Sequence, residues 1–176
     1  MQFHPTLMPT TTKATTCDSS PGAARAAASG MNFELQVKLA VYGYFAETGV
    51  SPSCDQVAER VGAPAGDVVQ AYQQLRAQRV LVLEDDGISI RMAPPFSGVA
   101  TQHVVKAGSR SYFANCAWDA LGIPAALQKP ATIYSRCEQS MESLRLEVDL
   151  EGPASSDWVF HCVVPAAHWW DDIVFT

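Results

Sequence analysis

Two residues with reactive side chains, Cys116 and Asp119, lie three positions apart in the segment 112–124. On a helix this spacing places a thiol and a carboxyl on one face. Asn115, a residue type that caps helices, directly precedes the thiol, so we expect Cys116 near a helix start. There the partial positive charge of the helix N-terminus favours the thiolate. A thiolate beside an acid that can hold or deliver a proton suits soft-metal chemistry better than ordinary hydrolysis.

The residues alone leave four interpretations of this pair open. The first is a small buried cysteine with an aspartate near a helix start, which is the usual role of a cysteine. The second is a cysteine–histidine hydrolase, although no nearby histidine is placed as its base. The third is a metal site in which Cys137 joins Cys116 and Asp119, and the fourth is a redox-sensing thiol with no resolving partner indicated. The scattered histidines are His4, His103, His161 and His168.

Length and composition set the frame for these interpretations. The chain has 176 residues, 48% of them apolar, enough for one medium domain or two small ones. No stretch approaches the roughly 18 uncharged apolar residues of a membrane span. The net charge of −6 argues against a general nucleic-acid binder.

The cysteines indicate a reducing compartment. Their number is odd, they form no CxxC pair, and residues 1–30 lack the apolar core of a secretory signal. We therefore expect reduced thiols in a cytoplasmic protein. The five cysteines are Cys17, Cys54, Cys116, Cys137 and Cys162.

Residues 1–30 are rich in Thr, Ala, Ser and Pro and have few large apolar side chains. Such a segment buries too little surface to offset its ordering entropy, so we expect a disordered tail. Met31 opens the first segment with a structured pattern and is expected to be the true start, in which case Cys17 has no role.

Residues 31–93 are predicted to form a winged-helix-like domain, with three helices followed by a β-hairpin. Ser51-Pro52-Ser53 opens the second helix, and Gly87 closes the acidic hairpin turn. The helices are expected to end near Gly49, Gly62 and Arg79.

Charge argues against DNA binding by this domain. Its third helix offers only Arg76 and Arg79, and residues 31–96 hold five basic residues against eight acidic ones. DNA affinity depends on many phosphate contacts from Lys and Arg. We therefore expect the domain to pack against the catalytic part or to support dimerisation.

After a predicted linker at residues 94–98, residues 99–176 alternate strand-like runs with the Cys116 helix, which predicts a mixed α/β core and an α+β fold overall. Trp118, Trp158, Trp169 and Trp170 are expected to be mostly core aromatics. The expected strands cover 99–105, 132–137, 144–150 and 158–164, and a further one begins at 171.

The segment Tyr-Phe-Ala-Asn-Cys-Ala-Trp-Asp-Ala-Leu at 112–121, with Ile-Pro-Ala at 123–125, resembles the catalytic segment of organomercurial (alkylmercury) lyases. That family shows a Cys-Ala-x-Asp core, then a Leu and a Pro-Ala, and a further cysteine in a strand about twenty residues on, where Cys137 stands. The resemblance extends more weakly over residues 31–176. It implies a winged-helix-like domain that does not bind DNA, followed by an antiparallel-rich catalytic core.

The resemblance implies protonolysis of a carbon–mercury bond to a hydrocarbon and Hg(II). Cys116 would be the mercury-binding thiolate, and Asp119 would deprotonate a thiol, contact mercury transiently and protonate the leaving carbon. Cys137 matches a family cysteine with a structural role. The implied reaction needs no cofactor, since mercury is substrate and product. External thiols, cellular thiols or a mercuric reductase would accept Hg(II), and neither nucleic acid nor membrane is an expected partner.

The family also uses a second catalytic cysteine, which its spacing puts at or just beyond the end of this chain. Cys162 lies within the preceding predicted strand and does not align with it, and Asn115 replaces an aromatic residue of the family. We therefore expect a core that is truncated, with an in-frame UGA codon for selenocysteine as one origin. Weak or no turnover is then expected, with mercury binding through Cys116 retained.

Two other functions remain as alternatives. One is a mercury- or thiol-responsive winged-helix regulator without lyase activity. The other is a relative that handles another electrophile or metal, such as copper.

Overall fold

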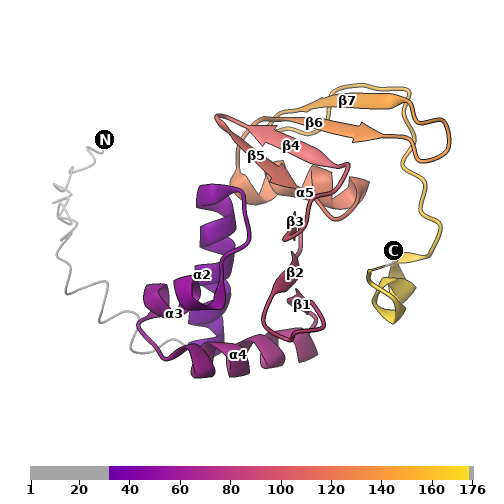
Figure 1. Ribbon diagram of the computed structural model, residues 1–176. Coiled ribbons are helices and arrows are strands. Elements are labelled where there is room, and N and C mark those ends of the chain that lie inside the picture. The colour runs from indigo at the N-terminus through magenta and orange to yellow at the C-terminus, as the bar shows by residue number, and fades with distance from the viewer. Residues whose placement is uncertain (1–31, 175–176) are drawn as a thin grey trace, which may run out of the picture. The chain divides into compact units, whose positions relative to one another are not determined.

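The computed structural model describes residues 32–174 and contains helices together with antiparallel sheets, so the predicted α+β class is confirmed (Figure 1). The expected tail at 1–30, the start at Met31, Cys17 and His4 lie outside the described residues. Between residues 32 and 174, every helix is too short or too polar to cross a bilayer.

The first part of the described chain has three helices and a small antiparallel sheet, in the order that the sequence predicts. Asn32 caps the first helix by accepting a hydrogen bond from the Glu34 N–H, and Ser53 and Gln56 form a capping box at the second. The winged-helix assignment itself stays a prediction. The elements are α2 (Phe33–Thr48), α3 (Cys54–Val61), α4 (Ala65–Ala77), β1 (Val82–Leu83), β2 (Ile90–Ala93) and β3 (Phe96–Ser97).

Residues 94–98, expected as a linker, instead contain strand β3. It pairs with β2 through Met92↔Ser97 and Ala93↔Phe96 and completes the sheet β1-β2-β3. A strand of two residues between Pro95 and Gly98 is too short to show an alternating pattern, so the sequence gives no sign of it.

The second part is a four-stranded antiparallel sheet in the order β5-β4-β6-β7, with α5 packed against β4 and β6 (Figure 1). Its longest pairing runs from Ala131↔Val148 to Arg136↔Ser143. The elements are β4 (Val104–Ala107), β5 (Arg110–Phe113), α5 (Ala117–Leu127), β6 (Ala131–Arg136), β7 (Ser143–Val148) and the 3-10 helix η1 (Ala166–Asp171).

Three strand predictions in this part are wrong or displaced. The strand expected at 99–105 begins only at Val104. The run 158–164 is irregular, and residues 171–174 follow η1 instead of starting a strand. Val159 and Val163 are 88% and 76% exposed. An apolar run becomes a strand only when a neighbouring strand pairs with it, and the described residues offer none here.

Phe96 lies at the centre of the aromatic core that joins the two parts. Its ring stacks on Phe45 of α2 at 5.4 Å and meets Tyr112 of β5 at 5.7 Å. The Tyr112 hydroxyl donates to the Ala46 carbonyl of α2 at 2.9 Å. One continuous cluster of buried side chains therefore runs from α2 to α5.

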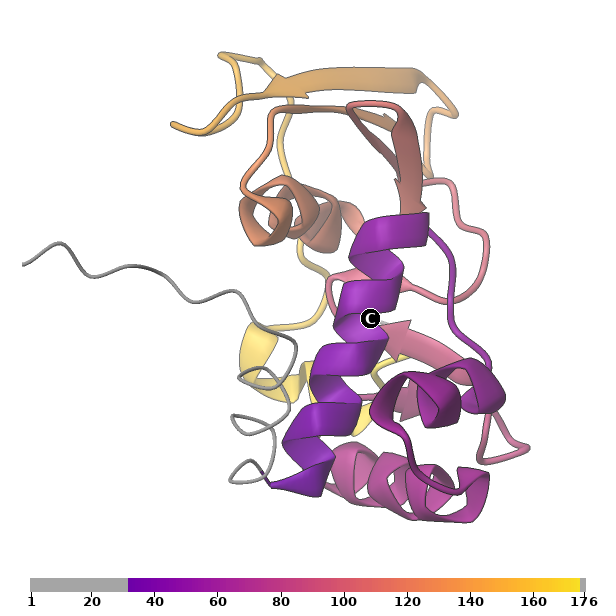
Figure 2. The same cartoon turned by 90° about the vertical axis from the view of Figure 1, so that its left-hand side faces the viewer.

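Helix α2 extends from the other helices to the second sheet, and its C-terminal end lies at β5 (Figure 2). Gly49 ends the helix with φ +82°, in the left-handed region. A Cβ at this position would lie 2.3 Å from the Ser111 carbonyl oxygen. The close approach of α2 to β5 therefore requires a glycine.

We predict that Gly49→Ala lowers the free energy of unfolding by about 2–3 kcal/mol, because left-handed strain and overlap with the backbone of β5 add together. Gly66→Ala, in the first turn of α4, is the control, because the new Cβ meets no atom of another element within 4 Å, and it should raise this free energy by at most about 0.5–1 kcal/mol. Urea unfolding measures both. Equal stabilities for the two variants would contradict this account of the α2–β5 contact.

Candidate active site

Cys116 is the N-cap residue of α5, as the sequence predicts for a thiol near a helix start. Its backbone is extended (φ −149°, ψ 179°), and its carbonyl accepts the first helical hydrogen bond from the Ala120 N–H at 3.0 Å. The Sγ atom accepts from the Asp119 N–H at 3.5 Å. The thiol thus takes the capping place that a hydroxyl or carboxylate oxygen usually fills.

Asp119 stands one turn into α5, and its side chain is held by the residue before the thiol. Asn115 Nδ2 donates to Asp119 Oδ2 at 2.8 Å and lies 3.3 Å from the Phe96 carbonyl oxygen. All three site side chains are half-buried. The predicted juxtaposition of thiol and carboxyl is therefore present, with the amide as a third member.

Tyr42 of α2 lies near enough to this site to sense the charge of Asp119. Its hydroxyl lies 3.2 Å from the Pro94 carbonyl oxygen and 3.3 Å from that of Val80. Burial raises the pKa of Tyr42 to about 12, and the negative charge of nearby Asp119 adds to this rise. Tyr42 therefore stays neutral, and it is a neighbour of the acid that no sequence spacing indicates.

The protonation of the pair differs from the expectation that the helix N-terminus favours the thiolate. Burial raises the pKa of Cys116, although the Asp119 N–H opposes it, and the Asp119 charge raises it again. Burial also raises the pKa of Asp119, against the hydrogen bond from Asn115. Desolvation is the largest influence on both pKa values and outweighs the helix terminus, and no cation among residues 32–174 counters it. The site therefore retains protons that exposed groups would release.

Cys137 is placed apart from this pair, in the loop between β6 and β7. Its Sγ accepts from the Ser140 N–H at 3.5 Å, and hydrogen bonds from Ser140 and the Gln139 backbone lower the pKa of this thiol. Within residues 32–174, no group of three or more His, Cys, Asp or Glu side chains is arranged to hold a metal. The structure thus does not support a joint site of Cys116, Asp119 and Cys137.

Cys162 lies closer to the site than the sequence indicates. Trp118 of α5 contacts Phe160 with 6.0 Å between ring centroids, which brings the segment 158–162 over the start of the helix. The charge of Cys162 is the smallest of the causes that raise the pKa of Cys116. A ring contact between residues 42 positions apart has no short-range sequence signal, so this neighbour could not be predicted.

The described histidines make contacts of their own outside the pair. His103 Nδ1 is 2.8 Å from Ser135 Oγ, and burial lowers the pKa of this imidazole. His168 Nδ1 is 3.0 Å from Asp171 Oδ2, and His161 is exposed. Among the contacts of the described residues none joins an imidazole to Cys116, which disfavours the cysteine–histidine hydrolase.

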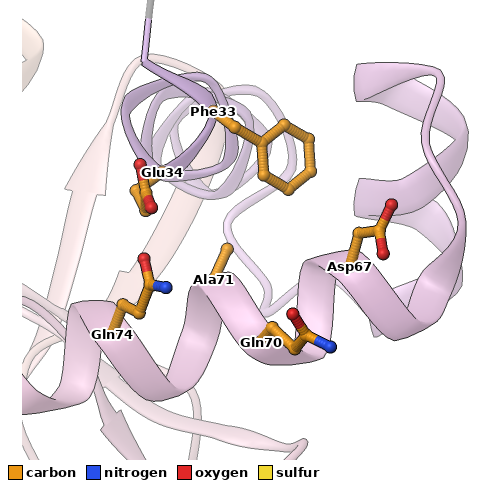
Figure 3. Close-up of a pocket in the computed structure, with 6 residues that line it drawn as sticks. All are labelled: Phe33, Glu34, Asp67, Gln70, Ala71 and Gln74. Atoms are coloured by element: carbon orange, nitrogen blue, oxygen red, sulfur yellow. The ribbon is translucent and has the colours of Figure 1, made fainter.

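Two cavities open elsewhere on the described chain. One of about 230 Å³ lies between α2, which supplies Phe33 and Glu34, and α4, which supplies Asp67, Gln70, Ala71 and Gln74 (Figure 3). The other, about 620 Å³, is lined by residues from 51–55 and 84–99 and by Ala65 and Val69 of α4. Neither lining includes Cys116 or Asp119, so neither cavity belongs to the site at α5.

The Cys116–Asp119 pair therefore offers a soft nucleophile and an adjacent proton carrier in partly dehydrated surroundings. Such a pair can bind a thiophilic metal at sulfur and move a proton over a short distance. It lacks a placed imidazole base, so acyl-transfer chemistry has less support.

Comparison with known proteins finds likeness to alkylmercury lyases. The family model described as alkylmercury lyase matches residues 96–176. Among solved structures, the crystal structure of the mercury-bound form of MerB2 aligns with a TM-score of 0.56 and 21% identity, over 76% of this chain and 64% of that one. No match was found among curated proteins. The predicted resemblance to alkylmercury lyases is confirmed.

We predict that Cys137 is alkylated by iodoacetamide with a lower pH midpoint than Cys116. Hydrogen bonds lower the pKa of the first thiol, whereas burial raises that of the second. Peptide mass spectrometry across a pH series measures the alkylation midpoint of each thiol. The midpoint follows the pKa of the thiol, whereas its accessibility changes only the overall rate. Ser140→Ala should raise the Cys137 midpoint alone, because the Ser140 side chain is the largest of the causes that lower it. A lower midpoint for Cys116 would contradict the desolvation argument.

We also predict that Asp119→Asn stabilises the fold at neutral pH and hardly at all in acid. The folded-state pKa of Asp119 is raised. As pH rises, the unfolded chain therefore releases this proton first, from about pH 3.9. The wild type loses stability from there until the pH passes the raised pKa, and the variant does not. Thermal melts at several pH values test this, and a stability difference independent of pH would contradict it.

Proposed function

Because residues 96–176 match the alkylmercury lyase family, we propose that this chain has an organomercurial lyase-like function. The reaction is protonolysis of a carbon–mercury bond to a hydrocarbon and Hg(II). The observation that carries the proposal is the hydrogen-bonded trio of Cys116, Asp119 and Asn115 at the buried start of α5. The chain spans 64% of the length of the MerB2 structure it resembles, so the activity is proposed for these residues as they stand.

In the first step, the Cys116 sulfur binds the mercury of R–Hg⁺ and gives up its proton to the Asp119 carboxylate. Metal binding deprotonates a thiol outright, so a raised thiol pKa does not prevent capture. It does require a proton acceptor, and the Asp119 carboxyl stands one helical turn away in the same buried site. Its own raised pKa favours its holding the proton once it has been transferred.

In the second step, the Asp119 carboxylic acid delivers that proton to the carbon bonded to mercury. The electron pair of the Hg–C bond forms the new C–H bond, R–H leaves, and Hg(II) stays on the Cys116 thiolate. No oxidant or reductant is needed. A raised pKa suits a proton donor, because the carboxylic acid holds its proton more strongly than an exposed carboxyl would until the carbon takes it.

The reaction as proposed uses no resident cofactor. Organomercurials are the substrates, and external thiols or a mercuric reductase would remove Hg(II). The proposed setting is the cytoplasm, and the cysteines of residues 32–174 are free thiols, namely Cys54, Cys116, Cys137 and Cys162. For Cys137 we propose a structural role in the β6–β7 loop, where its backbone N–H donates to the Glu142 carbonyl at 2.9 Å.

We further propose that the helical part binds no nucleic acid. Arg79, one of two arginines near the C-terminal end of α4, lies over the Trp170 ring, with 5.9 Å between its guanidinium carbon and the ring centroid. At the hairpin, Arg91 is paired with Glu84 at 3.1 Å, and Asp86 accepts hydrogen bonds within the turn. These cations are engaged inside the chain, and the acidic hairpin repels phosphate.

Hydrocarbon release from phenylmercury or methylmercury with excess thiol tests the proposal. We predict weak release by the wild type, no release in Cys116→Ser, and no release with retained mercury binding in Asp119→Asn. Release and mercury binding respond differently in Asp119→Asn because the Cys116 sulfur captures mercury, whereas the Asp119 carboxyl only carries the proton. Gas chromatography measures the hydrocarbon, and intact-protein mass spectrometry measures the bound metal.

Cys137→Ser is the matched control, since it removes a thiol of the same domain that lies outside the pair, and it should leave release unchanged. Mercury bound at Cys116 without any release would favour a mercury-binding regulator instead. Mercury binding that survives in Cys116→Ser would show that this thiol is not the mercury ligand.

A further inference from the structure

Asn115 is bound more tightly into the site than an ordinary residue before a helix. Its Nδ2 lies 2.8 Å from Asp119 Oδ2 and 3.3 Å from the Phe96 carbonyl oxygen. A side-chain amide has two N–H donors, and these two acceptors use both. The amide therefore connects the acid of α5 to strand β3.

The other end of the same amide is buried and unpaired. Asn115 Oδ1 has no hydrogen-bond partner among residues 32–174. Rotating the amide by 180° would turn this oxygen towards the Asp119 carboxylate and the Phe96 carbonyl, both acceptors, so the observed orientation is the favourable one. A purely structural amide would be expected to pair both ends, since unpaired buried acceptors are rare and costly.

The backbone that carries Asn115 is fixed on three sides. The neighbouring Ala114 donates to the His103 carbonyl at 2.9 Å, and the Thr101 hydroxyl donates to the Ala114 carbonyl at 2.6 Å. Ala114 also forms an antiparallel bridge with Phe96. The backbone that carries the amide is therefore rigid. A side chain that orients another side chain requires such a rigid support.

The consequence for Asp119 is that its two carboxyl oxygens differ. Oδ2 is held by the amide, whereas Oδ1 accepts no hydrogen bond from the described residues. One oxygen is therefore fixed by the amide, and the other is available for proton exchange.

From this geometry we propose that Asn115 is a positioning residue, which orients the Asp119 carboxyl so that its free oxygen faces the mercury-bound substrate. The role rests on the proposed lyase function but assigns a task to a residue that binds neither mercury nor the proton. Correct placement of a reacting group is worth orders of magnitude in rate, so its loss should appear in turnover and not in metal capture.

The test compares Asn115→Leu, which keeps the approximate size and removes the donors, with Gln102→Leu as control. Gln102 is an amide on the same part of the chain that pairs with Glu138 and Arg136, away from the acid. Phenylmercury is loaded onto each protein, mercury at Cys116 is counted by mass spectrometry, and benzene release is followed in a single turnover. Asn115→Ala, which only removes atoms, is measured in parallel in case the leucine variant does not fold.

We expect unchanged mercury loading and release slowed by at least about tenfold in the Asn115 variants, with no change in Gln102→Leu. Unchanged release would overturn the inference, and so would equal loss of loading and release, since the amide would then act on the thiol or the fold. If the wild type itself releases no benzene, the proposed function fails separately. The crystal structure of Asn115→Ala then decides: a displaced Asp119 carboxyl supports the positioning role, and an unmoved one overturns it.

Discussion

The burial of Phe96 is the interaction on which the rest of the structure depends. Its ring lies against Phe45 and Tyr112, so it ties the helices to the second sheet. Its backbone bridges Ala114, and its carbonyl meets the Asn115 amide. Truncating a buried ring of this size to alanine lowers the free energy of unfolding by about 3–5 kcal/mol. The packing that joins the two parts therefore also fixes the residues next to Cys116, and the site inherits its geometry from the core.

Desolvation sets the chemistry of that site. A helix N-terminus and a backbone N–H both favour a thiolate at Cys116, but burial outweighs them, and the pKa of Asp119 is raised in the same surroundings. A cation beside the pair would lower both pKa values. With both raised, a proton released by the sulfur can be held by the carboxyl and passed on to carbon. This requirement suits a substrate whose metal drives thiol deprotonation and whose carbon consumes the proton.

The sequence predicts what depends on neighbours in the chain. Helix ends at Gly49 and Gly62, the cap at Ser53 and the Cys116–Asp119 spacing are all local, and they appear in the structure. The sequence does not predict features that depend on contacts between residues far apart in the chain. Strand β3 exists because β2 pairs with it, and the charge of Asp119 acts on Tyr42 although 77 positions separate the two residues. The run 158–164 has strand propensity but no pairing partner among the described residues, so the strand predicted there from propensity alone is wrong.

The central claim is that Cys116 captures the organomercurial and Asp119 then protonates its carbon. A time course of intact-protein mass spectra after one equivalent of phenylmercury separates these events. The account predicts a phenylmercury adduct on Cys116 that converts to an Hg(II) adduct in the wild type and persists unconverted in Asp119→Asn. Conversion at equal rates in both proteins, or an adduct located on another residue, would contradict it.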